Sequence, residues 1–170
     1  MSGMKKLSKA KFHDPPNVLR QKVGYGGIDP ERIAKAEDYI QTNKADFIPY
    51  AEKIAVKLGA AIKKARAGKQ DDKVAIEVVI RIIMELKANG GMFRYMLMSE
   101  IAGIMLNFLE NIPSLNEDVF EIMDANYDAL NVIIKNRLSG SGGHEGRALA
   151  DELYKACQRY YTKHEIEVLG

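Results

Sequence analysis

The sequence contains no tryptophan and only one cysteine, Cys157. A single thiol cannot form a disulfide within the chain, and no CxxC pair is present, so the composition indicates the reducing environment of the cytosol. The 8 methionines supply adaptable apolar side chains in place of rigid indole rings. We therefore expect a cytoplasmic protein without an internal disulfide.

Long uninterrupted apolar runs are also missing. The richest apolar stretch, VAIEVVIRIIMEL, contains Glu77, Arg81 and Glu85, which is too many charges for a membrane-spanning helix. The first residues, MSGMKKLSKAKFHDPP, are basic but no apolar run follows them, which argues against a secretory signal. We expect no membrane-bound segment.

The charge of the chain is unevenly distributed. Its net charge is +2, yet residues 1–23 contain six basic residues and one acidic residue, a net charge of +5 that leaves −3 for the rest. A basic arm beside an acidic body fits contact with nucleic acid or an acidic partner, and it also fits a solvated tail. As a function for the protein, nucleic-acid binding through this arm is the weakest hypothesis, because the body is net acidic and no recognition-helix motif is present.

The distribution of helix signals indicates an all-α protein. Residues 1–28 contain prolines and glycines and are predicted to be a flexible basic arm. Residues 29–170 are predicted to form one helical bundle domain. Its first helix begins in IDPERIAKAEDYI, which has an N-cap at Asp29 and a proline at the first helical position. Further helices are predicted over about 45–66, 71–91, 92–111, 114–138 and 147–163. No segment shows the alternation typical of strands. We expect an antiparallel four-helix bundle with additional N- and C-terminal helices.

The third predicted helix has an apolar stripe outside its core face. At about 100° per residue, one broad face is predicted to be core and contains Val74, Ala75, Val78, Val79, Ile82, Ile83 and Leu86. Ile80 and Met84 fall instead on a flank that carries charged residues. An apolar centre with a charged rim is typical of a contact patch. A helix buried on almost all sides would instead pack Met84 against a neighbouring helix.

The segment MELKANGGMF contains Lys87 three residues after Met84, followed by the small residues Ala88, Gly90 and Gly91. This pattern resembles the signature of histidine phosphotransfer domains, which are four-helix bundles that pass a phosphoryl group to and from receiver-domain aspartates. The signature has an exposed helical histidine, a lysine or arginine three residues later, and then small residues including glycine. The phosphoacceptor position falls on Met84. The resemblance covers residues 70–138, and the rest only by helix pattern.

The methionine changes what the resemblance implies. Phosphoryl transfer needs an imidazole nitrogen that attacks the aspartyl phosphate and holds the group, and a thioether is only a feeble acceptor. The resemblance therefore implies a non-catalytic two-component signalling adaptor that docks a receiver domain or a histidine kinase without relaying phosphate. Lys87 would meet the acidic pocket of a receiver. The expected docking surface consists of Ile80, Arg81, Met84, Lys87, Gly91, Met92 and Tyr95.

No other residue pattern indicates an enzyme, a metal site or a cofactor. His13, His144 and His164 are scattered, and neither His13 nor His164 has a basic residue three positions later within a helix. The glycine-rich SGSGGHEG lacks the GxxxxGK[ST] pattern of a phosphate-binding loop and is predicted to be a mobile connector. Cys157 is predicted to pack as a small hydrophobic residue. The alternative function is a structural or oligomerising helical protein that self-associates through the Ile80–Met84 stripe.

Overall fold

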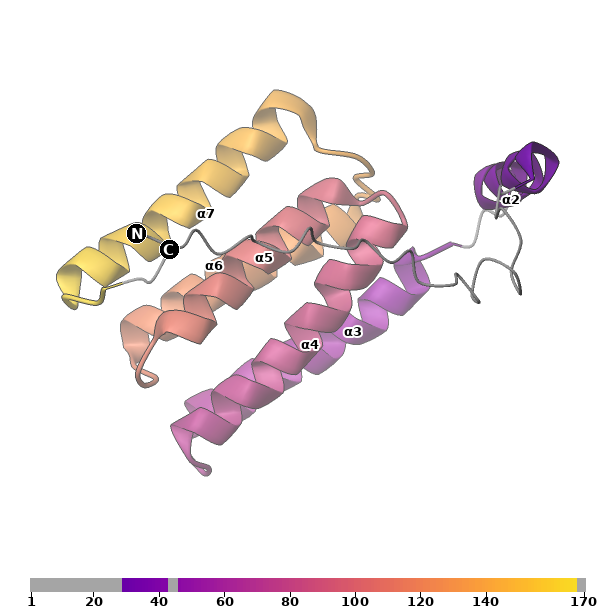
Figure 1. The fold of residues 1–170 in the computed structure, drawn as a ribbon. Helices are drawn as coiled ribbons and strands as arrows, with labels where there is room; N and C mark the ends of the chain where they lie inside the picture. Colours follow the sequence, from indigo (N-terminus) through magenta and orange to yellow (C-terminus); the bar gives the residue numbers. More distant parts are fainter. Residues whose placement is uncertain (1–28, 43–45, 168–170) are drawn as a thin grey trace, which may run out of the picture. The chain divides into compact units, whose positions relative to one another are not determined.

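The computed structural model describes residues 29–42 and 46–167 (Figure 1). This part of the chain contains six α-helices and no β-strand, which confirms the all-α class. The helices are α2 (Pro30–Thr42), α3 (Ile48–Arg66), α4 (Asp72–Met92), α5 (Met96–Asn111), α6 (Glu117–Lys135) and α7 (Gly143–Lys163). The predicted basic arm, residues 1–28, lies outside the described residues.

The chain divides into two compact units, residues 1–45 and 46–170. In the first unit, α2 begins where its sequence predicts. The Asp29 carboxylate accepts a hydrogen bond from the Glu31 N–H at 3.0 Å, and the Asp29 carbonyl accepts one from the Ile33 N–H at 3.0 Å. The Asp29 carboxylate therefore satisfies an N–H group that has no partner within the helix, and Pro30 follows at a position that needs no N–H donor.

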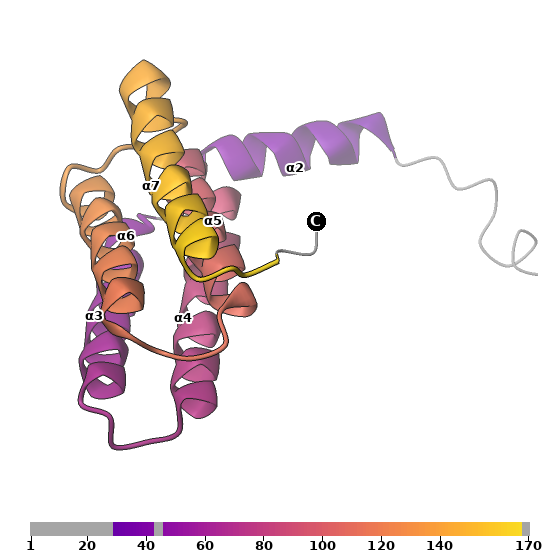
Figure 2. The same ribbon diagram turned by 90° about the vertical axis from the view of Figure 1, so that its left-hand side faces the viewer.

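In the second unit, the helices α3 to α6 surround a common apolar core. Helix α3 packs against α4 and α6, α5 packs against α4 and α6, and α7 packs against α5 and α6. Short loops join them, so that successive helices run in opposite directions (Figures 1 and 2). The core itself is formed by residues spaced three or four apart on each helix, which share one helix face.

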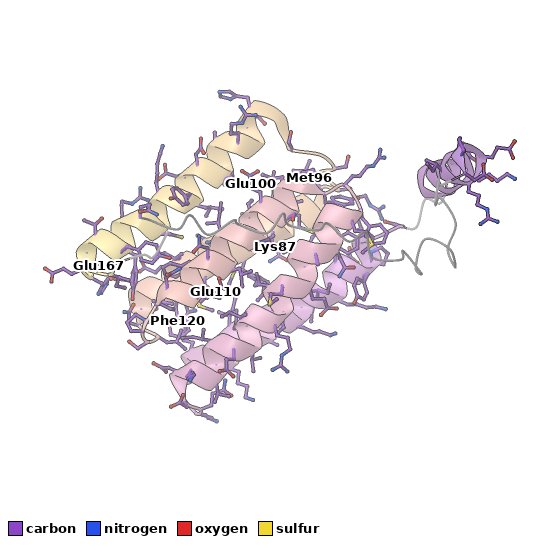
Figure 3. The ribbon with its side chains drawn as sticks, in the orientation of Figure 1. Lys87, Met96, Glu100, Glu110, Phe120 and Glu167 are labelled. Atoms are coloured by element: carbon purple, nitrogen blue, oxygen red, sulfur yellow. The ribbon has the colours of Figure 1, made fainter. Side chains whose placement is uncertain are left out.

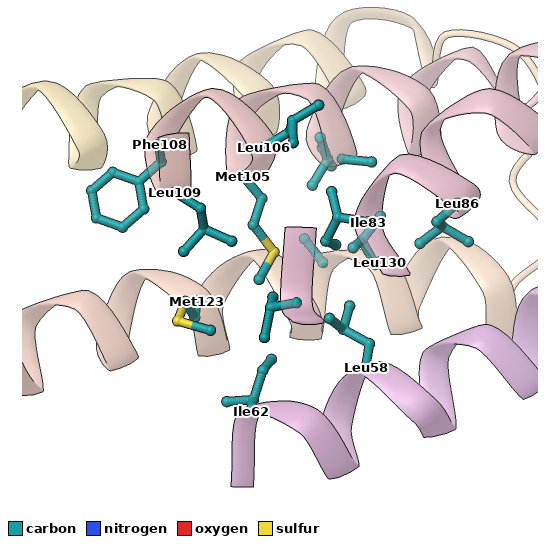
Figure 4. Close-up of a cluster of buried hydrophobic side chains, with 14 of the residues drawn as sticks. Leu58, Ile62, Ile83, Leu86, Met105, Leu106, Phe108, Leu109, Met123 and Leu130 are labelled. Carbon is teal, nitrogen blue, oxygen red and sulfur yellow. The ribbon is translucent and has the colours of Figure 1, made fainter. Parts of the chain in front are cut away.

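The centre of the core is aliphatic and rich in methionine (Figure 4). Leu58, Ile83 and Leu86 are fully buried there beside Met105 and Met123. Each such side chain contributes about 1.5–3 kcal/mol through removal of apolar surface from water. The flexible thioether side chains fill irregular space between helices, which agrees with the absence of tryptophan.

The junction between α4 and α5 differs from the prediction. The Gly90–Gly91 pair does not end the helix, since α4 continues to Met92 and α5 begins at Met96. The Tyr95 N–H donates to the Gly90 carbonyl at 2.8 Å and the Arg94 N–H donates to the Gly91 carbonyl at 3.3 Å. Arg94 has a φ of 64°, so this is a Schellman ending in which arginine stands where glycine is usual.

Gly90 serves the close approach of α5 to α4. It is buried, and a Cβ added at Gly90 would lie 3.4 Å from the Ser99 backbone nitrogen. A Cβ there would already be in van der Waals contact, so a side chain longer than that of alanine would push the two helices apart, because protein interiors have little free space. This glycine is therefore a packing residue, which explains why the helix runs through it.

The glycine-rich connector before α7 is anchored rather than free. The Gly140 N–H donates to the Arg94 carbonyl at 2.7 Å, and the Leu97 N–H donates to the Gly140 carbonyl at 2.9 Å. The connector is thus bonded to the α4–α5 turn, and α7 begins at Gly143 instead of near residue 147. Gly142 is its N-cap with a left-handed φ of 67°, a conformation that glycine adopts without a steric penalty.

Candidate functional site

The flank of α4 beside α5 carries the residues at the centre of the expected docking surface. Ile80, Met84 and Lys87 follow one another at intervals of about one turn, so they line one side of the helix. Met84 is 53% exposed, as the helical wheel predicts. Lys87 is also exposed, whereas Ile80 is partly buried and packs against the core. An exposed thioether therefore stands between a half-buried aliphatic side chain and an ammonium group.

The seven expected docking residues extend beyond the flank that bears Ile80, Met84 and Lys87. Arg81 and Met92 are about three turns apart and, at 100° per residue, lie about 60° and 80° around α4 from Met84, on the outer side that also bears Val74. Tyr95 lies beyond the end of α4, and its ring packs against Phe47 with 5.8 Å between centroids. Phe47 precedes α3, so Tyr95 belongs to the α3 side of the unit.

The predicted core face of α4 was wrong at two positions. Val74 and Val78 are 50% and 38% exposed, whereas Ile76, which was not assigned to that face, is buried. Within the described residues α4 packs against α3 and α5 alone. The buried stripe is therefore narrow, and the two valines lie outside it. Periodicity predicts which residues share a face, but it does not define how much of that face a neighbour covers.

Helix α5 supports the Lys87 segment in a way that the sequence prediction missed. The Ser99 hydroxyl donates a hydrogen bond to the Lys87 carbonyl at 2.9 Å. A Cβ added at Gly103 would lie 3.5 Å from Lys87 Cε and 3.7 Å from its Nζ, so the lysine side chain lies over the glycine. The signal in the sequence was Gly103 itself, because glycine inside a helix is costly and usually serves a close approach.

Lys87 has no ion pair with the described residues. The salt bridges of the described chain lie elsewhere, for example between Arg66 and Asp124 at 2.7 Å. The ammonium group of Lys87 is consequently available to an acidic partner at the α4–α5 surface. An exposed pair of this kind contributes about 0–1 kcal/mol by itself, so Lys87 would add specificity to an apolar contact.

The remaining candidates lie away from this flank. His144 is in the first turn of α7 and His164 follows the end of that helix, where its Nε2 is 3.0 Å from Asp118 Oδ2. His13 lies outside the described residues. Within the described residues, no three histidine, cysteine or acidic side chains come together as metal ligands would.

Cys157 packs as a small hydrophobic residue, as predicted. It is a free, buried thiol on α7. Burial raises the pKa of the Cys157 thiol to about 11, because a thiolate is poorly stabilised away from water. Such a group is a weak nucleophile at neutral pH.

Comparison with protein-family models, curated proteins and solved structures gave no match. Among the described helices, none is both long and apolar enough to cross a membrane.

Proposed function

We propose that this chain is a non-catalytic two-component signalling adaptor of the histidine phosphotransfer type. In this proposal α3 to α6 are the antiparallel four-helix bundle, with α7 as an additional C-terminal helix. A receiver domain or a histidine kinase docks on the flank of α4 formed by Ile80, Met84 and Lys87, and no phosphoryl group is relayed.

The observation that carries the proposal is the exposure of Met84 in the middle of α4. A large apolar side chain in that position is surrounded by charged residues, and such a centre with a charged rim is typical of a protein interface. Lys87 is exposed one turn later on the same flank, at the spacing of the phosphotransfer signature. The Ser99 hydroxyl on α5 donates a hydrogen bond to the Lys87 carbonyl, so the neighbouring helix supports this end of the flank.

The residue at the acceptor position excludes relay through that position. The Met84 thioether has no nitrogen or acidic proton with which to form a labile phosphoryl bond. A protein that docks the same partners without accepting phosphate would compete with a true phosphotransfer protein or sequester a phosphorylated regulator.

Binding to a panel of purified receiver domains and kinases from the source organism tests the proposal. Met84→Asp puts an unpaired charge in an apolar contact, and we expect affinity to fall by tenfold or more, which is about 1.4 kcal/mol or more. Because Met84 is exposed, the free energy of unfolding should change by only about 0.5 kcal/mol. Val132→Asp, at an apolar position on α6 that is 50% exposed, is the matched control away from α4. Unchanged binding by Met84→Asp would contradict the proposed surface.

A gain of function gives a second, independent test. If the α4 flank presents residues as a phosphotransfer domain does, Met84→His should accept an acid-labile phosphoryl group from a phosphorylated receiver that binds the chain. The wild-type chain and Val132→His, with the new histidine exposed on α6, should stay unlabelled. Labelling of the wild-type chain, at His144 or His164 for example, would overturn the adaptor proposal.

Self-association through the exposed stripe is the competing function. Light scattering after size-exclusion chromatography distinguishes it, because a dimer that Met84→Asp dissociates would make α4 an oligomer interface. The adaptor proposal expects a monomer across the micromolar range.

A further inference from the structure

A groove of about 940 Å³ lies along α5, between the edge of α4 and helix α7. Figure 3 labels several of the residues that line it. The residues used below are Lys87, Met96, Glu100, Gly103, Glu110 and Tyr154. Most of this surface belongs to α5 and α7, so it extends well beyond the Met84 flank.

The groove combines an apolar surface with separated charges. Met96 and Tyr154 are 52% and 51% exposed, which makes them available to an apolar ligand. Glu100 and Glu110 both line it, about 15 Å apart along α5 at 1.5 Å per residue. Both are exposed, and neither forms a salt bridge within the described residues. Lys87 lies between them, over Gly103.

We propose that this groove binds an amphipathic helix of a partner protein that carries a lysine or arginine near each end of its apolar face. The apolar face would cover Met96 and Tyr154, and the cations would pair with Glu100 and Glu110. Lys87 repels a cation at the middle, so the basic residues are restricted to the ends. Docking of an amphipathic helix into a groove is a common mode of peptide recognition.

The size of the groove agrees with such an occupant. Half the volume of a helix about 10 Å wide and about 20 Å long is roughly 800 Å³. A segment of about 14 residues therefore fits when its inner half is embedded and its outer half stays in water. The proposal extends the proposed function, because it assigns a second partner surface that does not use Met84.

Gly103 allows the groove to be filled without disturbing the core. The atoms that a Cβ at Gly103 would meet belong to the flexible Lys87 side chain, at 3.5 Å or more. A longer side chain at this position grows into the groove. Because glycine is unfavourable within a helix, Gly103→Met should keep or raise the melting temperature.

The experiment measures binding of a synthetic helical peptide of about 14 residues, with leucines along one face and a lysine near each end. Fluorescence anisotropy of the labelled peptide gives the affinity. We expect Gly103→Met to weaken binding at least tenfold, and Glu100→Gln combined with Glu110→Gln to weaken it and reduce its salt dependence. Ala88→Met adds the same side chain outside the groove and should bind as the wild type does.

Three results would each overturn the proposal. They are unchanged binding to Gly103→Met, equal binding of a peptide with glutamates in place of the lysines, and absence of binding to the wild-type chain. Met84→Asp should bind the peptide normally. This separates the two proposals, because Met84 does not line the groove, so receiver binding can be lost in Met84→Asp while peptide binding persists.

Discussion

The hydroxyl of Tyr127 on α6 occupies the space over Gly59 on α3. A Cβ added at Gly59 would lie 2.5 Å from the Tyr127 Oη atom and 2.8 Å from its Cζ atom. These distances are too short for real atoms, so any side chain at Gly59 displaces the tyrosine ring. The contact brings α3 and α6 together at the centre of the second unit.

A double-mutant cycle should therefore change sign. Gly59→Ala alone should lower the free energy of unfolding by about 1 kcal/mol, because it overpacks the contact. In the Tyr127→Ala background the same change should raise it by about 0.5–1 kcal/mol, since alanine is the better helix residue. Urea denaturation of the four proteins measures both values. A loss of equal size in both backgrounds would show that Tyr127 is not the obstacle.

Arg94→Gly should stabilise the protein. Arg94 has a φ of 64°, and a left-handed conformation costs a residue with a Cβ about 1–2 kcal/mol. Glycine removes that cost but adds entropy to the unfolded chain, so we expect a net gain of about 0.5–1 kcal/mol. Thermal and urea unfolding measure the gain. Arg94→Ala keeps the Cβ and is the control, for which no gain is expected.

Asn126→Leu should also leave stability equal or increased. Asn126 is 0% exposed on α6, and its Oδ1 atom has no hydrogen-bond partner among the residues that the structure describes. An unsatisfied buried acceptor costs about 1–3 kcal/mol, and leucine has a similar branched shape. Asn126→Ala should instead destabilise, because it leaves a cavity. A large loss of stability in the leucine variant would show that the amide is needed where it is.

The contact between α6 and α7 should contribute to the free energy of unfolding at neutral pH and lose that contribution in acid. Lys163 and, to a smaller extent, His164 bond the Asp118 carboxylate and hold its pKa below the ordinary value of 3.8. A lowered carboxyl pKa stabilises the folded state above the unfolded pKa, and that stabilisation is lost as pH falls through the folded pKa. Asp118→Asn should therefore be less stable than the wild type at pH 7. The difference should shrink below about pH 4, and unfolding curves at several pH values measure it.

Local sequence signals predicted much of the helical architecture. Asp71 and Asn116 are side-chain caps of α4 and α6, and both stand where polar residues precede apolar periodicity. The ends of helices were harder to predict, because Arg94 and Arg137 adopt left-handed conformations that local preference assigns to glycine. The left-handed conformation of these two arginines is determined by backbone hydrogen bonds and by the packing of the following residues. A short stretch of sequence contains neither kind of information.

The exposure of Met84 could be predicted because it depends on one helix alone. The exposure of Val78 could not be predicted, since it depends on how much of the surface of α4 is covered by α3 and α5. The groove was also beyond prediction. Glu100 and Tyr154 lie on helices separated by all of α6, and only the packing of α7 against α5 makes them part of one surface.

The anchoring of α7 at both ends has a kinetic consequence. Helix α7 forms one wall of the groove. Gly140, just before this helix, bonds to the α4–α5 turn, and Lys163 and His164 at its end bond to Asp118. A wall held in this way does not have to open before a helix enters. The observed rate of peptide association should therefore rise linearly with peptide concentration, without the plateau that a slow opening step imposes, and differences between ligands should lie mainly in residence time.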